Sequence, residues 1–182
     1  MDFLPKEMLL EIFQFLQARD LLALTAVSTT FNLIISSTER LLDKIPLYLN
    51  VDEDKLAAKE FIVRGASHLE VKNFIKNSLI EGSRRYTKII IGNIDGEDAI
   101  DVLKKWKTTV KQLTFRRGCY SLKHICRILE VCSSVKRLRF CRGSLRGDIK
   151  VEGCELPKLT LQSLHLENVG SQVFKVLKES KV

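Results

Sequence analysis

A recurring pattern of apolar residues is the feature of this sequence that most constrains its fold. The segment at residues 110–115 (VKQLTF) returns at 135–140 (VKRLRF) and again at 161–166 (LQSLHL). Residues 86–91 (YTKIII) keep the same apolar positions, and a poorly formed fifth copy lies near residues 47–49. The four clear copies begin at residues 86, 110, 135 and 161, so they recur at a nearly fixed period. Such a period indicates stacked structural units whose neighbours bury one continuous core.

Within each copy the apolar residues alternate, which predicts a short strand. Between the copies, apolar residues at helical spacing predict helices over residues 97–106, 125–132 and 173–177. Strands that alternate with helices through short links imply parallel stacking with right-handed connections. Residues 143–160 show no helical stripe and are expected to be irregular, whereas residues 53–80 are expected to be helical.

Strand geometry also predicts which side chains reach the open face of these repeats. If Leu113 and Phe115 point into the core, the residues between and beside them point outward, because successive side chains in a strand alternate. Repeat proteins usually bind partners on the concave surface that such residues form. The candidate target contacts are therefore Arg116, Arg137, Arg139 and His165. A solvated charged face would explain the three arginines equally well, and a single histidine is more often an ordinary surface residue.

The first 45 residues predict a different architecture, made of three short helices. Pro5 suits the first turn of a helix, and apolar residues then recur at three- and four-residue spacing, at Met8, Leu9, Ile12, Phe13 and Leu16. Asp20 offers a cap for a second helix and Ser28 for a third, whose apolar face continues to Ile45. So few helices cannot cover all their apolar residues. Part of this surface is expected to dock a partner, and packing onto the following repeats is the alternative.

The order and spacing of residues 4–37 resemble the F-box, the motif by which substrate receptors join Skp–cullin–F-box ubiquitin ligases. The resemblance rests on Leu4-Pro5, Glu7, Ile12-Phe13-x-Phe15-Leu16, Asp20-Leu21, Leu24, Val27-Ser28 and Phe31-Asn32. Thr25 departs from the family pattern, which often has a basic residue or cysteine there. The resemblance implies that the residues that contact the Skp adaptor, or brace the helices that do, are Leu4, Pro5, Ile12, Phe13, Leu16, Leu21, Leu24, Val27 and Phe31.

The L-x-x-L-x-L spacing of the later copies resembles a leucine-rich repeat, of the kind that often follows an F-box. Together the two resemblances imply an α/β chain. A three-helix F-box would span residues 1–46, and a partial leucine-rich-repeat region would span residues 47–182, with clear repeats from about residue 86. This region would be a short solenoid of parallel strands with outer helices.

A chain of this organisation is expected to be the substrate-recognition subunit of a Skp–cullin–F-box ubiquitin ligase. It would bind a Skp-type adaptor and, through it, cullin, and would hold an unknown protein target that is acidic or phosphorylated. The charge distribution agrees with two regions that face different partners, because residues 1–60 carry a net charge of −4 and residues 61–182 a net charge of +12. A basic surface favours acidic proteins, phosphates or nucleic acid.

Two other functions stay open. The chain could be a basic repeat protein that binds nucleic acid or phosphorylated partners without ubiquitin-ligase function, although aromatic residues are sparse among its basic ones. It could also be an F-box protein that binds the adaptor but delivers no substrate.

The three histidines, His68, His124 and His165, are scattered, and the common phosphate-loop, zinc-protease and nucleophile-elbow motifs are absent. No catalytic activity, metal or cofactor is therefore expected.

Five cysteines, an odd number without a C-x-x-C pair, predict reduced buried thiols and a cytosolic or nuclear protein. No apolar run is long enough for a membrane span, and acidic residues interrupt the apolar stretch at the N-terminus. Neither a membrane association nor a signal peptide is expected. The repeats end at Val182 without a polar capping unit. We therefore expect either a longer repeat protein or a neighbour that covers this edge.

Overall fold

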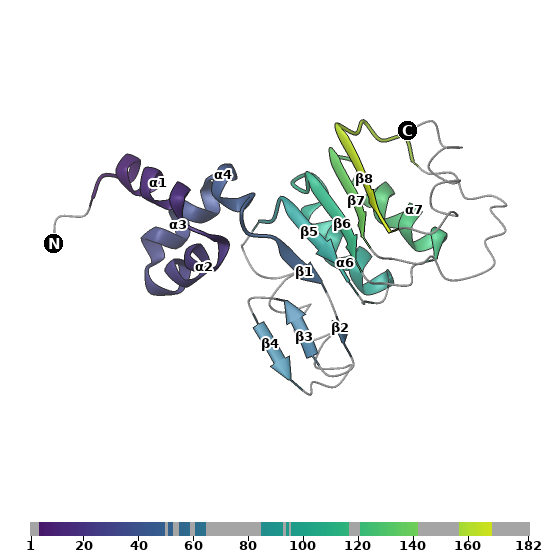
Figure 1. Ribbon diagram of the computed structural model, residues 1–182, viewed down its shortest axis with the longest axis horizontal. Helices are drawn as coiled ribbons and strands as arrows, with labels where there is room; N and C mark the ends of the chain where they lie inside the picture. Colours follow the sequence, from purple (N-terminus) through teal and green to yellow (C-terminus); the bar gives the residue numbers. More distant parts are fainter. Residues whose placement is uncertain are drawn as a thin grey trace.

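The computed structural model describes residues 4–49, 51–52, 55–58, 61–64, 85–92, 94, 96–116, 121–141 and 157–168. For the strands between residues 51 and 64 it describes the backbone alone. In Figure 1 the chain runs from a group of helices near the N-terminus to a five-stranded parallel sheet that helices accompany. An N-terminal helical region followed by a parallel sheet agrees with the mixed α/β class predicted from the sequence.

The N-terminal region has one helix more than predicted: α1 (Lys6–Phe15), α2 (Ala18–Val27), α3 (Thr29–Ser37) and α4 (Glu39–Leu42). Ser28 caps α3 as predicted, since its hydroxyl accepts a hydrogen bond from the Phe31 amide at 3.4 Å. The predicted continuation of this helix is wrong. Extended backbone at Thr38 ends α3 and starts the separate turn α4. The predicted cap at Asp20 is also wrong, because α2 begins at Ala18 and places Asp20 inside its first turn.

A small apolar core holds these four helices together. Its buried members are Leu9, Phe13, Leu21, Ile34, Ile35, Leu41 and Ile45. Phe13 packs edge to face against Phe31, with ring centroids 5.4 Å apart. Lys44 closes the end of α1, because its ammonium donates to the backbone carbonyls of Gln14 and Leu16, the latter at 3.1 Å. A cation at this end of a helix satisfies carbonyls that have no partner within the helix.

The second region is built on a parallel sheet in the order β1-β5-β6-β7-β8. Its strands are β1 (Leu47–Leu49), β5 (Lys88–Ile91), β6 (Gln112–Arg116), β7 (Arg137–Cys141) and β8 (Ser163–Glu167). They coincide with the recurring sequence copies, including the poorly formed one at 47–49, and every neighbouring pair is parallel as predicted.

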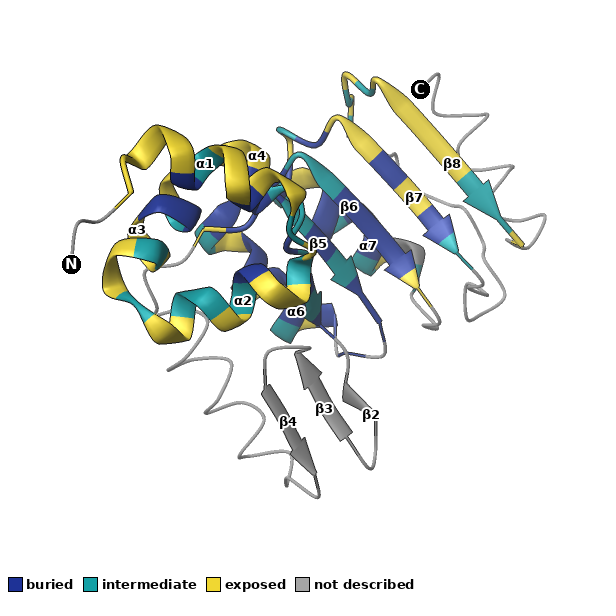
Figure 2. Cartoon of the chain, turned by 60° about the vertical axis from the view of Figure 1, so that its left-hand side comes forward, coloured by how far each residue is buried: buried dark blue, intermediate teal, exposed yellow. Residues whose placement is uncertain are grey.

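Helices α6 (Gly96–Trp106) and α7 (Leu122–Val131) follow β5 and β6 where the sequence predicts helices. Alternate strand residues, among them Ile91, Phe115 and Phe140, are buried with helix residues such as Trp106 and Leu129 in one core. The strand register places Phe115 beside Phe140, and their rings stack with centroids 5.0 Å apart. Figure 2 shows that buried positions concentrate on β5, β6 and β7, whereas β8 is mostly exposed.

Residues 51–64 contradict the helix predicted over residues 53–80. They form three short antiparallel strands in a second sheet: β2 (Val51–Asp52), β3 (Lys55–Ala58) and β4 (Phe61–Arg64). The run Phe61-Ile62-Val63 consists of aromatic and β-branched residues, which favour strands over helices. Three predicted segments lie outside the described residues: 65–80, the helix at 173–177, and most of the irregular stretch at 143–160.

Three cysteines lie among the described residues, and none of them forms a disulfide. Cys126 and Cys132 are buried, and Cys141 is partly exposed. Burial raises the pKa of the Cys132 thiol to about 12, because a buried thiolate would lose its hydration. Within the described ranges no group of three histidine, cysteine or acidic side chains could hold a metal ion. None of the helices described there has the length and apolar character needed to cross a membrane.

Candidate functional site

Helix α1 carries apolar residues on two sides. One side, which includes Leu9 and Phe13, packs into the helical core. The other side consists of exposed residues spaced four and three apart, Met8, Ile12 and Phe15, and Leu4, just before the helix begins at Lys6, is exposed as well. Residues at this spacing lie on the same side of a helix, so the three side chains on α1 form one outward stripe. Phe15 is 86% exposed, so it contributes almost nothing to the chain's own core.

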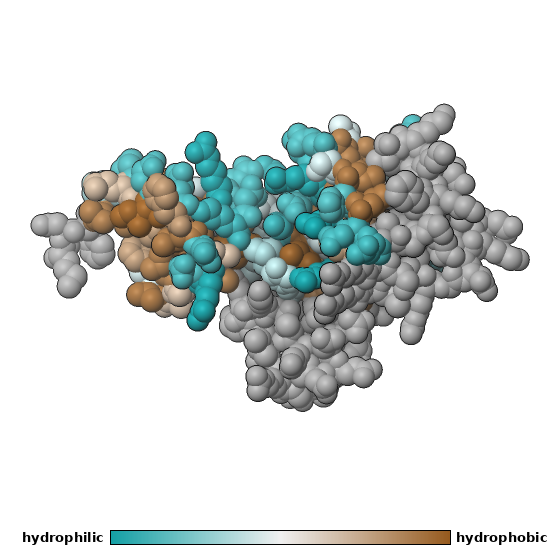
Figure 3. All heavy atoms as spheres, in the orientation of Figure 1, coloured by the Kyte–Doolittle hydropathy of each residue, from teal (hydrophilic) through white to brown (hydrophobic). Residues whose placement is uncertain are grey.

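Two further large apolar side chains are exposed on α2 and α3. Val27, the last residue of α2, is 76% exposed, and Leu33 on α3 is 69% exposed. We call the whole set the apolar helix face: Leu4, Met8, Ile12, Phe15, Val27 and Leu33. Among the large apolar side chains that are exposed in the described part of the chain, only Leu164 lies elsewhere. Figure 3 shows hydrophobic residues gathered over α1–α3, and such a surface usually marks a docking site.

The nine residues that the sequence assigned to adaptor binding divide by exposure. Four are exposed: Leu4, Pro5, Ile12 and Val27. Two are buried in the helical core: Phe13 and Leu21. The other three are partly buried against that core: Leu16, Leu24 and Phe31. The buried ones can only brace the helices, so direct contact would fall to the exposed ones. Sequence reasoning left out Met8, Phe15 and Leu33, although the spacing along α1 could have shown the first two.

A second surface lies on the sheet, on the side away from α6 and α7. It is a hollow of about 340 Å³, which we call the polar hollow, and its lining residues are Lys88, Ile90, Gln112, Thr114, Arg116, Arg139, Cys141 and Glu167. These residues alternate with the core residues of β5–β8, as strand geometry predicts. The register sets Ile90, Thr114 and Arg139 side by side in one row across the sheet. Arg116, Cys141 and Glu167 form the next row.

The polar hollow has more positive than negative charge, because three cations face one carboxylate. Arg139 donates a hydrogen bond to Glu167 at 2.7 Å, and this bond raises the pKa of the Arg139 guanidinium. Lys88 and Arg116 form no ion pair with any other residue that the structure describes. The hollow therefore offers two cations that remain available to a negatively charged partner.

The four predicted target contacts have different surroundings. Arg116 and Arg139 line the polar hollow. Arg137 lies outside its lining and contacts Asp43 of the helical region, with 3.9 Å between Nη2 and Oδ2. His165 is exposed, and its Nε2 lies 3.9 Å from Glu167. Alternation along the strands predicted that the lining residues, Lys88 and Ile90 among them, face outward, but Lys88 was not chosen as a target contact and is therefore a missed candidate.

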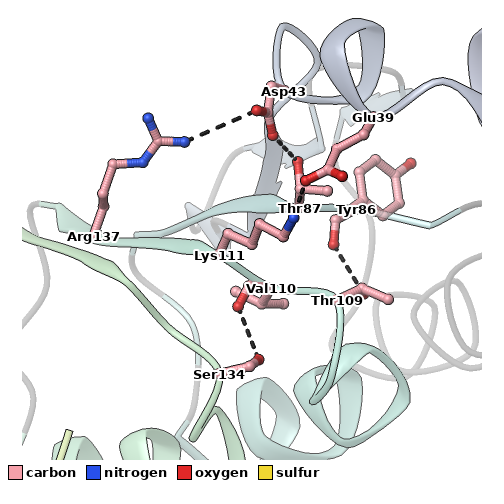
Figure 4. Close-up of polar contacts among 9 residues, drawn as sticks. All are labelled: Glu39, Asp43, Tyr86, Thr87, Thr109, Val110, Lys111, Ser134 and Arg137. Atoms are coloured by element: carbon pink, nitrogen blue, oxygen red, sulfur yellow. Dashed lines mark hydrogen bonds and ion pairs between the residues drawn. The ribbon is translucent and has the colours of Figure 1, made fainter. Parts of the chain in front are cut away.

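Polar contacts join the helical region to the amino ends of three strands (Figure 4). Thr87, next to the first residue of β5, donates a hydrogen bond from its hydroxyl to Asp43 at 2.6 Å. Lys111, next to the first residue of β6, pairs with Glu39 of α4. Arg137 begins β7 and approaches Asp43. These contacts, which we call the junction, lie between the region that carries the apolar helix face and the sheet that carries the polar hollow.

Comparison with known families gives one match. Residues 1–45 match the model of the F-box-like family. The matched segment contains the four helices and all six residues of the apolar helix face. Searches of curated proteins and of solved structures find no match. The N-terminal region is thus F-box-like, which supports an F-box protein and suggests that this region binds an adaptor.

Proposed function

We propose that this chain is the substrate-recognition subunit of a Skp–cullin–F-box ubiquitin ligase. The apolar helix face would bind the Skp-type adaptor and, through it, cullin. The sheet region would be a leucine-rich-repeat solenoid that binds a target protein. The observation that carries the proposal is that large apolar side chains stay exposed within the segment that matches the F-box-like family.

The physical basis of adaptor binding is the burial of apolar side chains in a partner's groove. Full burial of one leucine or phenylalanine contributes about 1.5–3 kcal/mol. Met8, Ile12 and Phe15 share one side of α1 and are about half exposed or more, so an adaptor could bury a large part of each. A few such anchors usually supply most of the binding energy of an interface.

The proposal that the sheet is a repeat solenoid rests on the match between period and structure. Successive copies of the sequence pattern supply successive parallel strands, and a helix lies in the connection from β5 to β6 and in that from β6 to β7, whereas strands β2–β4 lie between β1 and β5. Each unit buries its apolar residues against its neighbours in one core, as solenoid repeats do. We propose a cytosolic or nuclear protein with no catalytic residue or cofactor of its own, since the ligase scaffold would supply the chemistry.

The test is direct binding of a purified Skp-type adaptor to the full chain, measured by calorimetry. Ile12→Ala and Phe15→Ala should each weaken binding, by about 1–2 kcal/mol per anchor. Neither side chain belongs to the apolar core of the helical region, so thermal stability should change little. Lys123→Ala, an exposed substitution on α7, serves as the control and should bind like the original chain. Unchanged affinity in the Ile12→Ala/Phe15→Ala double variant would exclude this face as the adaptor site.

Delivery of a target for degradation needs a separate experiment in cells. Proteins retained on both the original chain and the Ile12→Ala/Phe15→Ala variant are candidate targets, whereas those lost on the variant belong to the ligase. A retained protein should be shorter-lived with the original chain than with the variant. Equal lifetimes would indicate an F-box protein that binds the adaptor without delivering a substrate.

A further inference from the structure

We propose that the polar hollow binds an extended acidic segment of the target protein, with one carboxylate at Lys88 and a second at Arg116. This inference rests on the proposed function, because it assumes that the sheet is the face that binds the target. It goes further by naming the chemistry of the recognised segment and the two cations that select it.

The positions of the two available cations indicate two separate contacts. Lys88 begins β5 and is paired in register with Gln112, the first residue of β6. Arg116 is the last residue of β6, four positions beyond Gln112. At about 3.3 Å per residue, the Cα atoms of the two cationic residues are about 13 Å apart along the strands, and the residues lie one strand apart across the sheet. An extended segment repeats this distance between residues i and i+4, which lie on the same face of the segment.

The floor of the hollow supplies a second and independent observation. Thr114 is on β6 and lies between Lys88 and Arg116 along the strand direction. It is only 5% exposed. Its hydroxyl has no hydrogen-bond partner among the side chains and backbone groups that the structure describes. A buried hydroxyl without a partner costs free energy. A carbonyl or carboxylate of a segment that lies in the hollow would provide the missing acceptor.

The residues that line the hollow argue for carboxylates rather than for nucleic acid. Arg139 already pairs with Glu167 inside the lining, so this surface accommodates a carboxylate at a guanidinium. Glu167 repels any anion, but a nucleic-acid backbone laid along the sheet carries a charge at every nucleotide and meets this repulsion more than a segment with two carboxylates four residues apart. None of the lining residues is aromatic, so the hollow offers no ring on which a base could stack. A single phosphate group would need to draw Lys88 and Arg116 to one point, whereas two carboxylates can meet each cation separately.

The experiment is a titration of the isotopically labelled full chain with a short peptide whose only charged residues are two glutamates four positions apart, and nuclear magnetic resonance follows the binding. We expect the largest shifts at amides of β5, β6 and β7. Replacing both glutamates by glutamines should weaken binding about 4- to 25-fold, since each exposed ion pair contributes about two- to fivefold. A third peptide has the two glutamines and one phosphoserine midway between them.

Three variants test the assigned residues against a matched control. Lys88→Ala and Arg116→Ala should each weaken binding of the diglutamate peptide about two- to fivefold, and should reduce the difference between the glutamate and glutamine peptides to the about two- to fivefold share of the remaining ion pair. Thr114→Val should weaken binding about two- to tenfold without destabilising the chain, because valine keeps the size and suits a strand. Lys123→Ala removes an exposed cation on α7 and should bind normally.

Equal binding of the glutamate and glutamine peptides, or no binding of either, would overturn the proposal. Tighter binding of the phosphoserine peptide than of the diglutamate peptide would replace it by phosphate recognition. No adaptor is present in these titrations, so their failure would leave adaptor binding by the apolar helix face intact. Conversely, a chain that fails to bind the adaptor would still give an interpretable peptide titration.

Discussion

The hydrogen bond from Thr87 to Asp43 is the contact in the junction whose loss should be easiest to measure. Thr87 is only 5% exposed, and its hydroxyl lies 2.6 Å from the Asp43 carboxylate. Thr87→Val replaces the hydroxyl by a methyl group of nearly the same size, so packing around the side chain should persist. The change therefore removes one bond between the helical region and the sheet.

The expected magnitude follows from the surroundings of the two groups. A hydrogen bond to a charged group contributes about 1.5–3 kcal/mol to stability. The Asp43 side chain is 38% exposed, so water can solvate the carboxylate after the bond is lost. We therefore expect Thr87→Val to lower the free energy of unfolding by about 1.5 kcal/mol, at the low end of that range. Arg137, 3.9 Å from Asp43 and half exposed, should contribute little.

Urea unfolding of a double-mutant cycle isolates the bond from other effects of each substitution. Thr87→Val, Asp43→Ala and the double variant should give a coupling energy of about 1–1.5 kcal/mol. Thr114→Val is the matched control, because Thr114 lies in the polar hollow and no contact links it to Asp43. Its effect should add to that of Asp43→Ala. A coupling energy below about 0.3 kcal/mol for Thr87 and Asp43 would refute the argument, because distant sites add within that error.

Three further predictions concern packing, helix termination and thiol chemistry. Gly96→Ala should destabilise the chain by about 1–3 kcal/mol in urea unfolding, because the added Cβ would lie 2.5 Å from Cγ of His124. Replacing glycine by alanine usually stabilises a helix, so a more stable variant would contradict this contact. Lys44→Met should lower thermal stability by about 1 kcal/mol, since it removes the donor to the Leu16 carbonyl at the end of α1; an unchanged melting temperature would show that water replaces it. Cys132 should resist alkylation near neutral pH, because its pKa of about 12 keeps the thiol protonated, and mass mapping should find it labelled only after unfolding.

The strands of the main sheet could be predicted because two independent periods agree in the sequence. Alternation within each copy predicts a strand, and recurrence of the copy predicts its parallel neighbour. The run at residues 47–49 also forms a strand although its copy is poorly formed, because its neighbour β5 supplies the pairing. Residues 51–64 lack such support, since no recurrence marks them, and local apolar spacing alone gave the wrong element there.

The helical region shows that residue spacing alone cannot tell a buried apolar stripe of a helix from an exposed one. Met8 and Leu9 are adjacent in sequence, and both fit a three- and four-residue pattern. In the structure Leu9 is buried whereas Met8 is 51% exposed. A helix with apolar residues on both sides carries two apolar stripes, and in the sequence the two stripes cannot be told from one broad stripe. Only the position of the other helices decides which stripe becomes the core, and that position depends on tertiary contacts such as those of Phe13 with Phe31.

The arginines of the sheet show why direction alone cannot assign a role to a side chain. Arg137 and Arg139 both alternate outward from β7, yet Arg137 approaches Asp43 in the junction and Arg139 lines the polar hollow. The difference arises because Arg137 begins the strand, at the edge of the sheet where the acidic residues of the helical region lie, and Arg139 lies two positions further along. Lys88 also begins its strand, but Asp43 takes its hydrogen bond from the neighbouring Thr87, and the Lys88 ammonium stays available. A search for target contacts on this sheet should therefore weigh Lys88 above Arg137.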